Sequence, residues 1–228
     1  MERFKSINIQ ILPGGGKEND MISFIAEMFS YPFIVRAFVV GVLVSLCAAL
    51  LGVSLVLKQY SMIGDGLSHV SYGALSIALA CNIAPLKLSI PIVIAAAFLL
   101  TEKGIMKSDA AIAAVSASAL AIGVSVTSLT TGMTTDVNSY MFGSILAMTR
   151  EDVVLSAVLS VVVLVLFVFC YHNIFAVTFD ESFGRAIGVK VSFYNSMIAI
   201  LTAVTIVLGM QMMGAMLISS LVIFPSLT

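Results

Sequence analysis

Long apolar segments separated by short polar breaks are the dominant pattern along this chain of 228 residues. The segments are continuous rather than alternating with period two, which favours transmembrane helices over the strands of a membrane barrel. A helix needs about 20 apolar residues to cross the hydrocarbon core of a bilayer. We therefore predict an all-α fold, a polytopic transmembrane helical bundle with about seven spans: 33–57, 67–83, 88–100, 110–129, 153–171, 192–208 and 212–224. The second span is expected to begin before residue 67.

A weaker stretch, 137–148, has a mixed composition that fits a re-entrant or surface helix. If this stretch does not cross, one side of the membrane carries Lys58, Lys103, Lys107, Arg185 and Lys190. The opposite side carries only Lys87 and Arg150. An excess of Lys and Arg marks cytoplasmic loops, so the first of these sides is predicted to face the cytoplasm.

Composition supports a membrane protein, since 60% of the residues are hydrophobic and only 10% are charged. Soluble domains carry about 25% charged residues, and so few charges could not cover a water-exposed surface. The net charge of −1, with no clustered basic face, indicates no nucleic-acid partner. There is no phosphate-binding lysine loop, nucleophile elbow or His-Glu-x-x-His motif, so nothing supports an ATPase, a hydrolase or a membrane protease.

The two ends of the chain differ from its middle. Residues 1–20 have neither an apolar core nor a cleavage site, so they are not a signal peptide. The glycines that precede Met21 fit a translated ribosome-binding site, which makes 1–20 a non-native leader; a short disordered tail is the alternative. Residues 21–228 would then form one transmembrane domain. Because the last apolar segment stops just after Pro225, we expect this domain to be incomplete at its C-terminus.

Asp65 and His69 are two ionisable residues in the second predicted span, whose start is expected before residue 67. Such residues are costly inside a membrane and are therefore functional candidates. The i, i+4 spacing places them on one helix face, about 6 Å apart, and a carboxylate with an imidazole suits a divalent metal. A homodimer with its axis along this face would supply four ligands, which suits Zn²⁺ or Mn²⁺. In the alternative interpretation, Asp65 caps the helix and His69 hydrogen-bonds a neighbouring helix.

The polar segment 179–188 is the second candidate. It reads as a short amphipathic helix with Asp180 as its N-cap and Gly188 as its C-terminal stop. Phe183 and Ile187 would share one face, on which a soluble cytoplasmic partner could dock. An ordinary interfacial helix is the alternative.

Four motifs occur in order: LKQYSMIGDGLSH at 57–69, YMFGSILA at 140–147, FDESFGRAIG at 179–188 and MGAML at 213–217. Together they resemble the integral-membrane permease of zinc and manganese ABC importers, and the resemblance covers nearly the whole chain from Ser30. Two departures from the family pattern are Gln59, where a second basic residue is usual, and Gly66, where a small or branched side chain is usual.

The resemblance implies a multi-pass subunit of a bacterial cell (plasma) membrane transporter, not an enzyme. Its implied partners are a second copy of itself, cytosolic ABC ATPase subunits, an extracytoplasmic metal-binding protein and the lipid bilayer. No permanently bound cofactor is implied; Asp65 and His69 would contact the transported divalent metal. Zn²⁺ is favoured because His is a good zinc ligand, with Mn²⁺ or Fe²⁺ as alternatives. The implied ATPase-coupling residues are Phe179, Asp180, Phe183, Arg185, Ile187 and Gly188. A stand-alone metal channel or proton-coupled carrier is the alternative function.

Overall fold

The computed structural model describes residues 29–58, 60, 62–102, 109–130, 142–143 and 149–224. Within these residues the chain forms helices and no strand, so the predicted all-α class is confirmed. The predicted leader at 1–20 and most of the stretch 137–148 lie outside the described residues. The expected incompleteness of the domain at its C-terminus stays a prediction.

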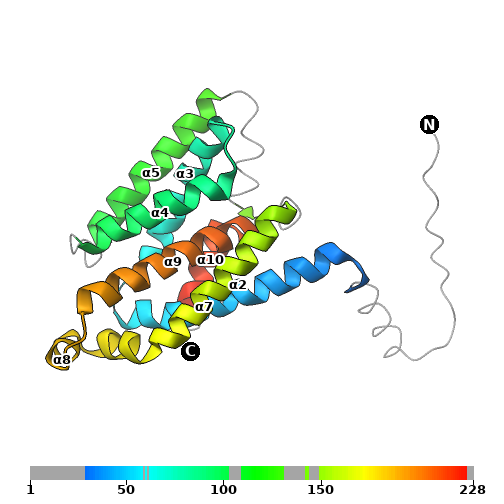
Figure 1. Ribbon diagram of the computed structural model, residues 1–228. Helices are drawn as coiled ribbons and strands as arrows, with labels where there is room; N and C mark the ends of the chain where they lie inside the picture. Colours follow the sequence, from blue (N-terminus) through cyan, green and yellow to red (C-terminus); the bar gives the residue numbers. More distant parts are fainter. Residues whose placement is uncertain are drawn as a thin grey trace, which may run out of the picture. The chain divides into compact units, whose positions relative to one another are not determined.

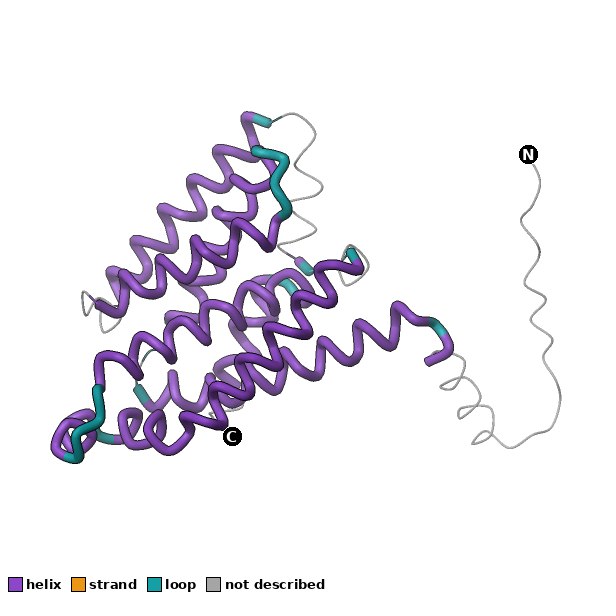
Figure 2. Tube along the Cα trace, in the orientation of Figure 1, coloured by secondary structure: helices purple, strands orange, loops and turns teal. Residues whose placement is uncertain are grey.

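Each predicted span is matched by a helix, and Figure 2 shows that short connections join many of them. The helices are α2 (Pro32–Leu57), α3 (Ile63–Ala80), α4 (Pro85–Glu102), α5 (Asp109–Leu129), α7 (Arg150–Phe179), α8 (Glu181–Ala186), α9 (Val191–Met213) and α10 (Ala215–Ile223) (Figure 1). As expected, α3 begins before residue 67. The chain divides into two units, Met1–Arg36 and Ala37–Thr228, and the packing below concerns the second.

Four helices of the described chain are long and apolar enough to cross a membrane: α2, Ala110–Leu129 within α5, α7 and α9. The apolar part of α4, Pro85–Leu100, is shorter. These lengths and compositions make the protein a multi-pass helical membrane protein. Additional crossings by α3, α4 and α10 stay predictions.

Helix α9 lies at the centre of the second unit. It packs against α3, α4, α7, α8 and α10, and 78% of its most apolar stretch is buried. In α7, by contrast, only 22% of the corresponding stretch is buried, and Val161, Val165 and Phe169 are exposed. A broad exposed apolar face suits contact with lipid, whereas the buried α9 forms the core around which the other helices pack.

Small residues allow the helices to approach closely. A Cβ atom added at Gly52 of α2 would lie 1.9 Å from the backbone oxygen of Val222 in α10. Likewise, a Cβ atom at Gly73 of α3 would lie 2.7 Å from the backbone oxygen of Ala119 in α5. Close backbone contact at small residues is the usual way in which membrane helices associate.

Helix α7 continues beyond the predicted end of its span at residue 171. Asn173 remains helical and its side-chain amide donates to the Tyr194 hydroxyl at 2.7 Å. The rings of Tyr171, Phe175 and Phe179 follow one another at i, i+4 spacing, with centroids 5.7 and 4.4 Å apart. At 30 residues, α7 is about 45 Å long, which exceeds the hydrocarbon core of about 30 Å. The extra turns carry α8 away from the apolar part of the span.

The α2–α10 contact leads to a test of packing. Gly52→Ala is expected to destabilise the protein by about 1–3 kcal/mol, because the new methyl group meets backbone that cannot rotate away. Gly41→Ala in the same helix is the matched control, since the nearest atom to its added Cβ is Met213 Cε at 3.8 Å. Thermal unfolding of the detergent-purified protein measures both, and equal unfolding temperatures for the two variants would contradict the close approach.

Candidate functional site

The Asp65–His69 pair lies on the first two turns of α3. The structure brings the side chains together, with Asp65 Oδ2 3.6 Å from His69 Nε2. Asp65 is the only exposed residue in α3, with 55% of its side chain accessible, while His69 is 22% accessible. Most of α3 is buried by neighbouring helices, so the pair marks the place where this helix is open.

Asp65 does not form the N-cap, which was the alternative interpretation. The N-cap is Met62, and its side chain makes no capping hydrogen bond. Asp65 is instead the third residue of the helix, where a carboxylate interacts favourably with the positive end of the helix dipole. Its backbone oxygen accepts a hydrogen bond from Ser68 Oγ at 2.7 Å, which leaves the carboxylate to face His69.

The separation of the two groups suits a shared metal ion. Ligands bound at about 2.1 Å in a tetrahedral arrangement lie about 3.4 Å apart, close to the observed 3.6 Å. In the part of the chain that the structure describes, no group of three or more His, Cys, Asp or Glu residues is placed to hold a metal. The described residues of one copy therefore bring two candidate metal ligands together at this position.

Helix α8 forms as its sequence predicts. Asp180 adopts an extended backbone (φ −149°, ψ 107°), and its Oδ1 accepts hydrogen bonds from the backbone N–H groups of Ser182 and Phe183 at 2.8 and 3.1 Å. At the other end Gly188 has φ +84°, its N–H donates to Arg185, and the next N–H donates to Gly184. This pair of bonds is the Schellman arrangement, which a glycine at this position favours.

The two faces of α8 differ sharply. Gly184 is buried, and a Cβ atom there would lie 3.5 Å from the side chains of Val177 and Val191. Phe183 and Ile187 are 57% and 54% exposed, and Arg185 is also exposed. The helix is therefore held to α7 and α9 by one face and presents apolar side chains on another.

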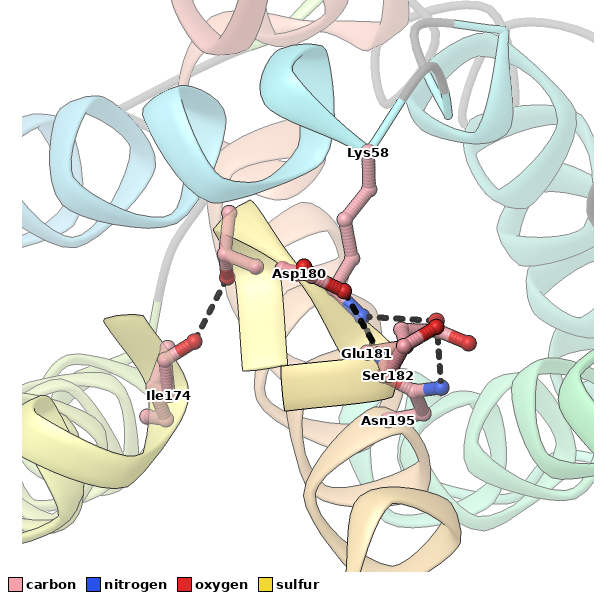
Figure 3. Close-up of polar contacts among 7 residues, drawn as sticks. Lys58, Ile174, Asp180, Glu181, Ser182 and Asn195 are labelled. Carbon is pink, nitrogen blue, oxygen red and sulfur yellow. Dashed lines mark hydrogen bonds and ion pairs between the residues drawn. The ribbon is translucent and has the colours of Figure 1, made fainter. Parts of the chain in front are cut away.

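A polar network joins α8 to α2 and α9. Lys58 Nζ donates to Glu181 Oε1 at 3.3 Å and to Asn195 Oδ1, and Asn195 Nδ2 donates to the same Glu181 oxygen at 3.1 Å. Figure 3 shows Lys58 extending from its backbone toward both residues. The lysine side chain is only 4% exposed. Burial raises the pKa of the neighbouring Tyr60 hydroxyl, and the Glu181 carboxylate adds to this increase.

Sequence reasoning did not identify this network. Lys58 served there only as a marker of membrane orientation, and neither Glu181 nor Asn195 was singled out. The available signal was Asn195, an amide near the beginning of a largely apolar span, because such side chains often hydrogen-bond to another helix.

Comparisons with known proteins agree with this architecture. The pattern of the ABC 3 transport family matches residues 30–228. A relative named "Probable metal transport system membrane protein" from Treponema pallidum (strain Nichols) is 31% identical, over 88% of this chain and 76% of its own. The high-affinity zinc uptake system membrane protein ZnuB of Buchnera aphidicola is 30% identical, over 87% of this chain and 77% of its own. The solved structure of PsaBC from Streptococcus pneumoniae in complex with Fab superposes with a TM-score of 0.77, at 27% identity, covering 89% of this chain and 74% of that one.

The fold and these matches define a class, the membrane-spanning permease subunits of ABC transporters. The chain belongs to the ABC 3 transport family. The family resemblance found in the sequence motifs is thereby confirmed, as is the prediction of a transporter subunit in place of an enzyme.

The cap of α8 can be tested locally. Asp180→Ala removes two hydrogen bonds to backbone N–H groups and should cost about 1 kcal/mol of local helix stability, or roughly a fivefold faster amide exchange. The expected increase is confined to the first turn of α8, at Ser182 and Phe183. Asp180→Asn keeps an accepting oxygen and is the matched control. Hydrogen–deuterium exchange measures both variants, and unchanged exchange in Asp180→Ala would contradict the capping role.

Proposed function

We propose that this chain is the permease subunit of an ATP-driven importer of divalent metal ions, supplied by an extracytoplasmic metal-binding protein. The single observation that carries the proposal is the Asp65–His69 pair, two metal-compatible ligands 3.6 Å apart at the open position of α3. Ionisable side chains in a membrane helix mark ion pathways more often than they serve packing. The relative ZnuB is named for zinc uptake, and a further relative is named "Manganese import system permease protein ScaB" from Streptococcus gordonii, at 28% identity over 90% of this chain and 74% of its own. Both names support the same substrate class.

The pathway forms between two copies of the chain. One copy provides one carboxylate and one imidazole, and a two-fold axis beside α3 doubles this set to four ligands. The exposure of Asp65 is consistent with such an axis, because a carboxylate that is half accessible in one copy can reach a ligand or partner at its surface. Binding at this station is modest in affinity, since a transporter must release its ion.

The transported ion is proposed to be Zn²⁺, with Mn²⁺ and Fe²⁺ as competing substrates. Imidazole nitrogen and carboxylate oxygen bind all three metals, and the preference for zinc rests on histidine as a zinc ligand. The relatives named above include both zinc and manganese systems, so they support the substrate class more strongly than the individual metal.

Membrane crossings by α3, α4 and α10, in addition to the four long helices, complete the proposed permease domain of about seven spans. Lys58 at the end of α2 contacts Glu181 just after α7, so these two helix ends lie on one side of the membrane. With α3, α4 and α5 crossing in turn, the end of α5 and the beginning of α7 both lie on the opposite side. The excess of basic residues near Lys58 and α8 assigns their side to the cytoplasm.

Helix α8 is the proposed docking element for the cytosolic ATPase. Its exposed Phe183 and Ile187 provide apolar anchors beside Arg185, the combination that often dominates protein interfaces. A hollow of about 420 Å³ lies next to its C-terminal turn, lined in part by Gly188, Lys190 and Phe193. Caps at both ends of α8 hold it rigid, so a push on this helix moves it as one body.

The metal pair can be tested by uptake. Loss of a residue that merely orients a metal ligand costs about 10–100-fold in affinity, so Asp65→Asn and His69→Ala should each lower uptake at least about tenfold. Radioactive zinc and manganese uptake is measured in cells that contain the ATPase and binding protein, with the amount of permease in the membrane checked by immunoblot. His172→Ala is the matched control, because His172 is exposed on α7. Normal uptake of both metals by both site variants would refute the assignment.

The docking element can be tested by co-purification. The double variant Phe183→Ala, Arg185→Ala should lose at least about tenfold of the bound ATPase, since truncation of two interface anchors typically costs 2 kcal/mol or more. Phe169→Ala is the matched control, because Phe169 is 87% exposed but lies within the span of α7. Recovery of the ATPase at the control level with the double variant would contradict docking through α8.

A further inference from the structure

Lys58, Glu181 and Asn195 come from three different elements and meet in one partly buried network (Figure 3). Lys58 follows the last residue of α2, Glu181 opens α8, and Asn195 lies on the second turn of α9. The Lys58 side chain is almost completely buried. A buried ammonium group that loses its partner is left with an uncompensated charge, so motion that separates Lys58 from Glu181 is less favourable than motion that carries them together.

Lys58 is also the first residue of a short, well-anchored connection to the metal pair. Tyr60 is buried, its backbone N–H donates to Leu55 at 2.8 Å, and its carbonyl accepts from Ile63 at 3.1 Å. Ile63, the first residue of α3, is fully buried. The N–H of Gly66 then donates to Met62 at 3.0 Å, around the turn that carries Asp65. These hydrogen bonds and the burial of Tyr60 and Ile63 tie the described residues of this connection to the end of α2 and the first turn of α3.

Helix α8 is held together by hydrogen bonds at both of its ends. Its N-terminal cap at Asp180 and its C-terminal turn at Gly188 fix both ends, and Glu181 belongs to its first turn. A displacement of α8 therefore moves the Glu181 carboxylate, to which the Lys58 ammonium group is bound.

We propose that Lys58, Glu181 and Asn195 are positioning residues that transmit displacement of α8 to the α2–α3 connection, and thereby to Asp65 and His69. The inference rests on the proposed function, because it assumes that the ATPase moves α8. This role is separate from ATPase docking and from metal binding. The three residues would couple a movement of α8 to a change in the positions of Asp65 and His69. Without the network, the two events remain linked only through the packing of α9 against α3.

The first experiment separates transport from ATP hydrolysis. Lys58→Met is reconstituted with the ATPase in proteoliposomes, and metal uptake and ATP hydrolysis are measured on the same sample. We expect assembly and hydrolysis close to the unsubstituted level, but at least a tenfold drop in metal transported per ATP hydrolysed. Lys58→Arg retains a positive donor and should recover most of this ratio. Lys87→Met, the same change at an exposed lysine in the first turn of α4, is the matched control and should leave the ratio unchanged.

A purely structural role for Lys58 predicts a different pattern, in which transport and hydrolysis fall together with the amount of assembled complex. That pattern, or an unchanged ratio, would overturn the inference. If Lys58→Met fails to enter the membrane, the same measurements are made on Glu181→Gln. The Glu181 side chain is 31% exposed, and glutamine has a similar shape without the charge. Where both single variants are obtained, the double variant should lower the ratio no further than either one, as residues of one network do not act additively.

The second experiment needs no metal and so separates this inference from the proposed function. Nitroxide labels are attached at Met62→Cys and Ser182→Cys, both exposed positions, in a variant in which Cys47, Cys81 and Cys170 are replaced. With Lys58 present, ATP binding to the associated ATPase should leave the distance between the labels unchanged, because α8 and the connection move together. In Lys58→Met the same nucleotide should shift or broaden that distance.

The outcomes of the second experiment decide between the two ideas. Labels that stay at a fixed separation with Lys58 but separate in Lys58→Met support the network, even if no variant transports a metal and the proposed substrate is wrong. Labels that behave identically in both proteins refute the network, even if Asp65→Asn abolishes uptake as proposed. Labels that separate on ATP binding with Lys58 present refute it as well.

Discussion

The hydrocarbon core of a bilayer offers no hydrogen-bond partners, so polar groups inside a span depend on the protein to satisfy them. Many serine and threonine side chains of this chain do so locally, by donating to the backbone oxygen four residues earlier in their own helix. Examples are Ser76, Thr127, Thr178, Thr202 and Thr205. This option is closed to a carboxylate, which has no proton to donate to a carbonyl when it is ionised. Asp65 instead lies at the exposed position of α3, with His69 of the same helix as its neighbour.

Neighbouring helices pack closely against most of α3 and leave the face with Asp65 and His69 more exposed. A Cβ atom at Gly66 would lie 2.6 Å from Cγ2 of Ile112, so the glycine that departs from the family pattern makes room for a side chain of α5. Gly73 does the same for the backbone near Ala119. Close contacts cover the remaining faces of α3, and the Asp65–His69 face stays open. Gly66 and Gly73 therefore let α5 cover part of α3, while Asp65 remains exposed and His69 partly exposed.

Local features of the sequence predicted most of the fold. Hydrophobic segments predicted the helices because span length is set by the thickness of the bilayer. The Asp65–His69 pair and both ends of α8 were predictable because a spacing of i, i+4 and a cap involve neighbouring residues. The apolar segment 153–171 predicted the span but not the helical turns after it, in which the rings of Tyr171, Phe175 and Phe179 follow one another along the same helix. The Lys58 network could not be predicted from periodicity, since Lys58 is separated from Glu181 by 123 positions and from Asn195 by 137.

The position of α8 in the chain explains why such a network matters. Asp180 alone separates α8 from α7, and a short turn separates it from α9, so those two helices feel any movement of α8 directly. Helix α9 packs against α3 along the core, which gives one route to the metal pair. That route acts through apolar side-chain packing, which is not directional and spreads a displacement over several neighbours of α9. The Lys58 contact provides a second route that ends at a single place, the first turn of α3. Because Asp65 lies on that turn, the two routes converge at its carboxylate, where a small rotation would change the distance to His69, its partner in the proposed metal site.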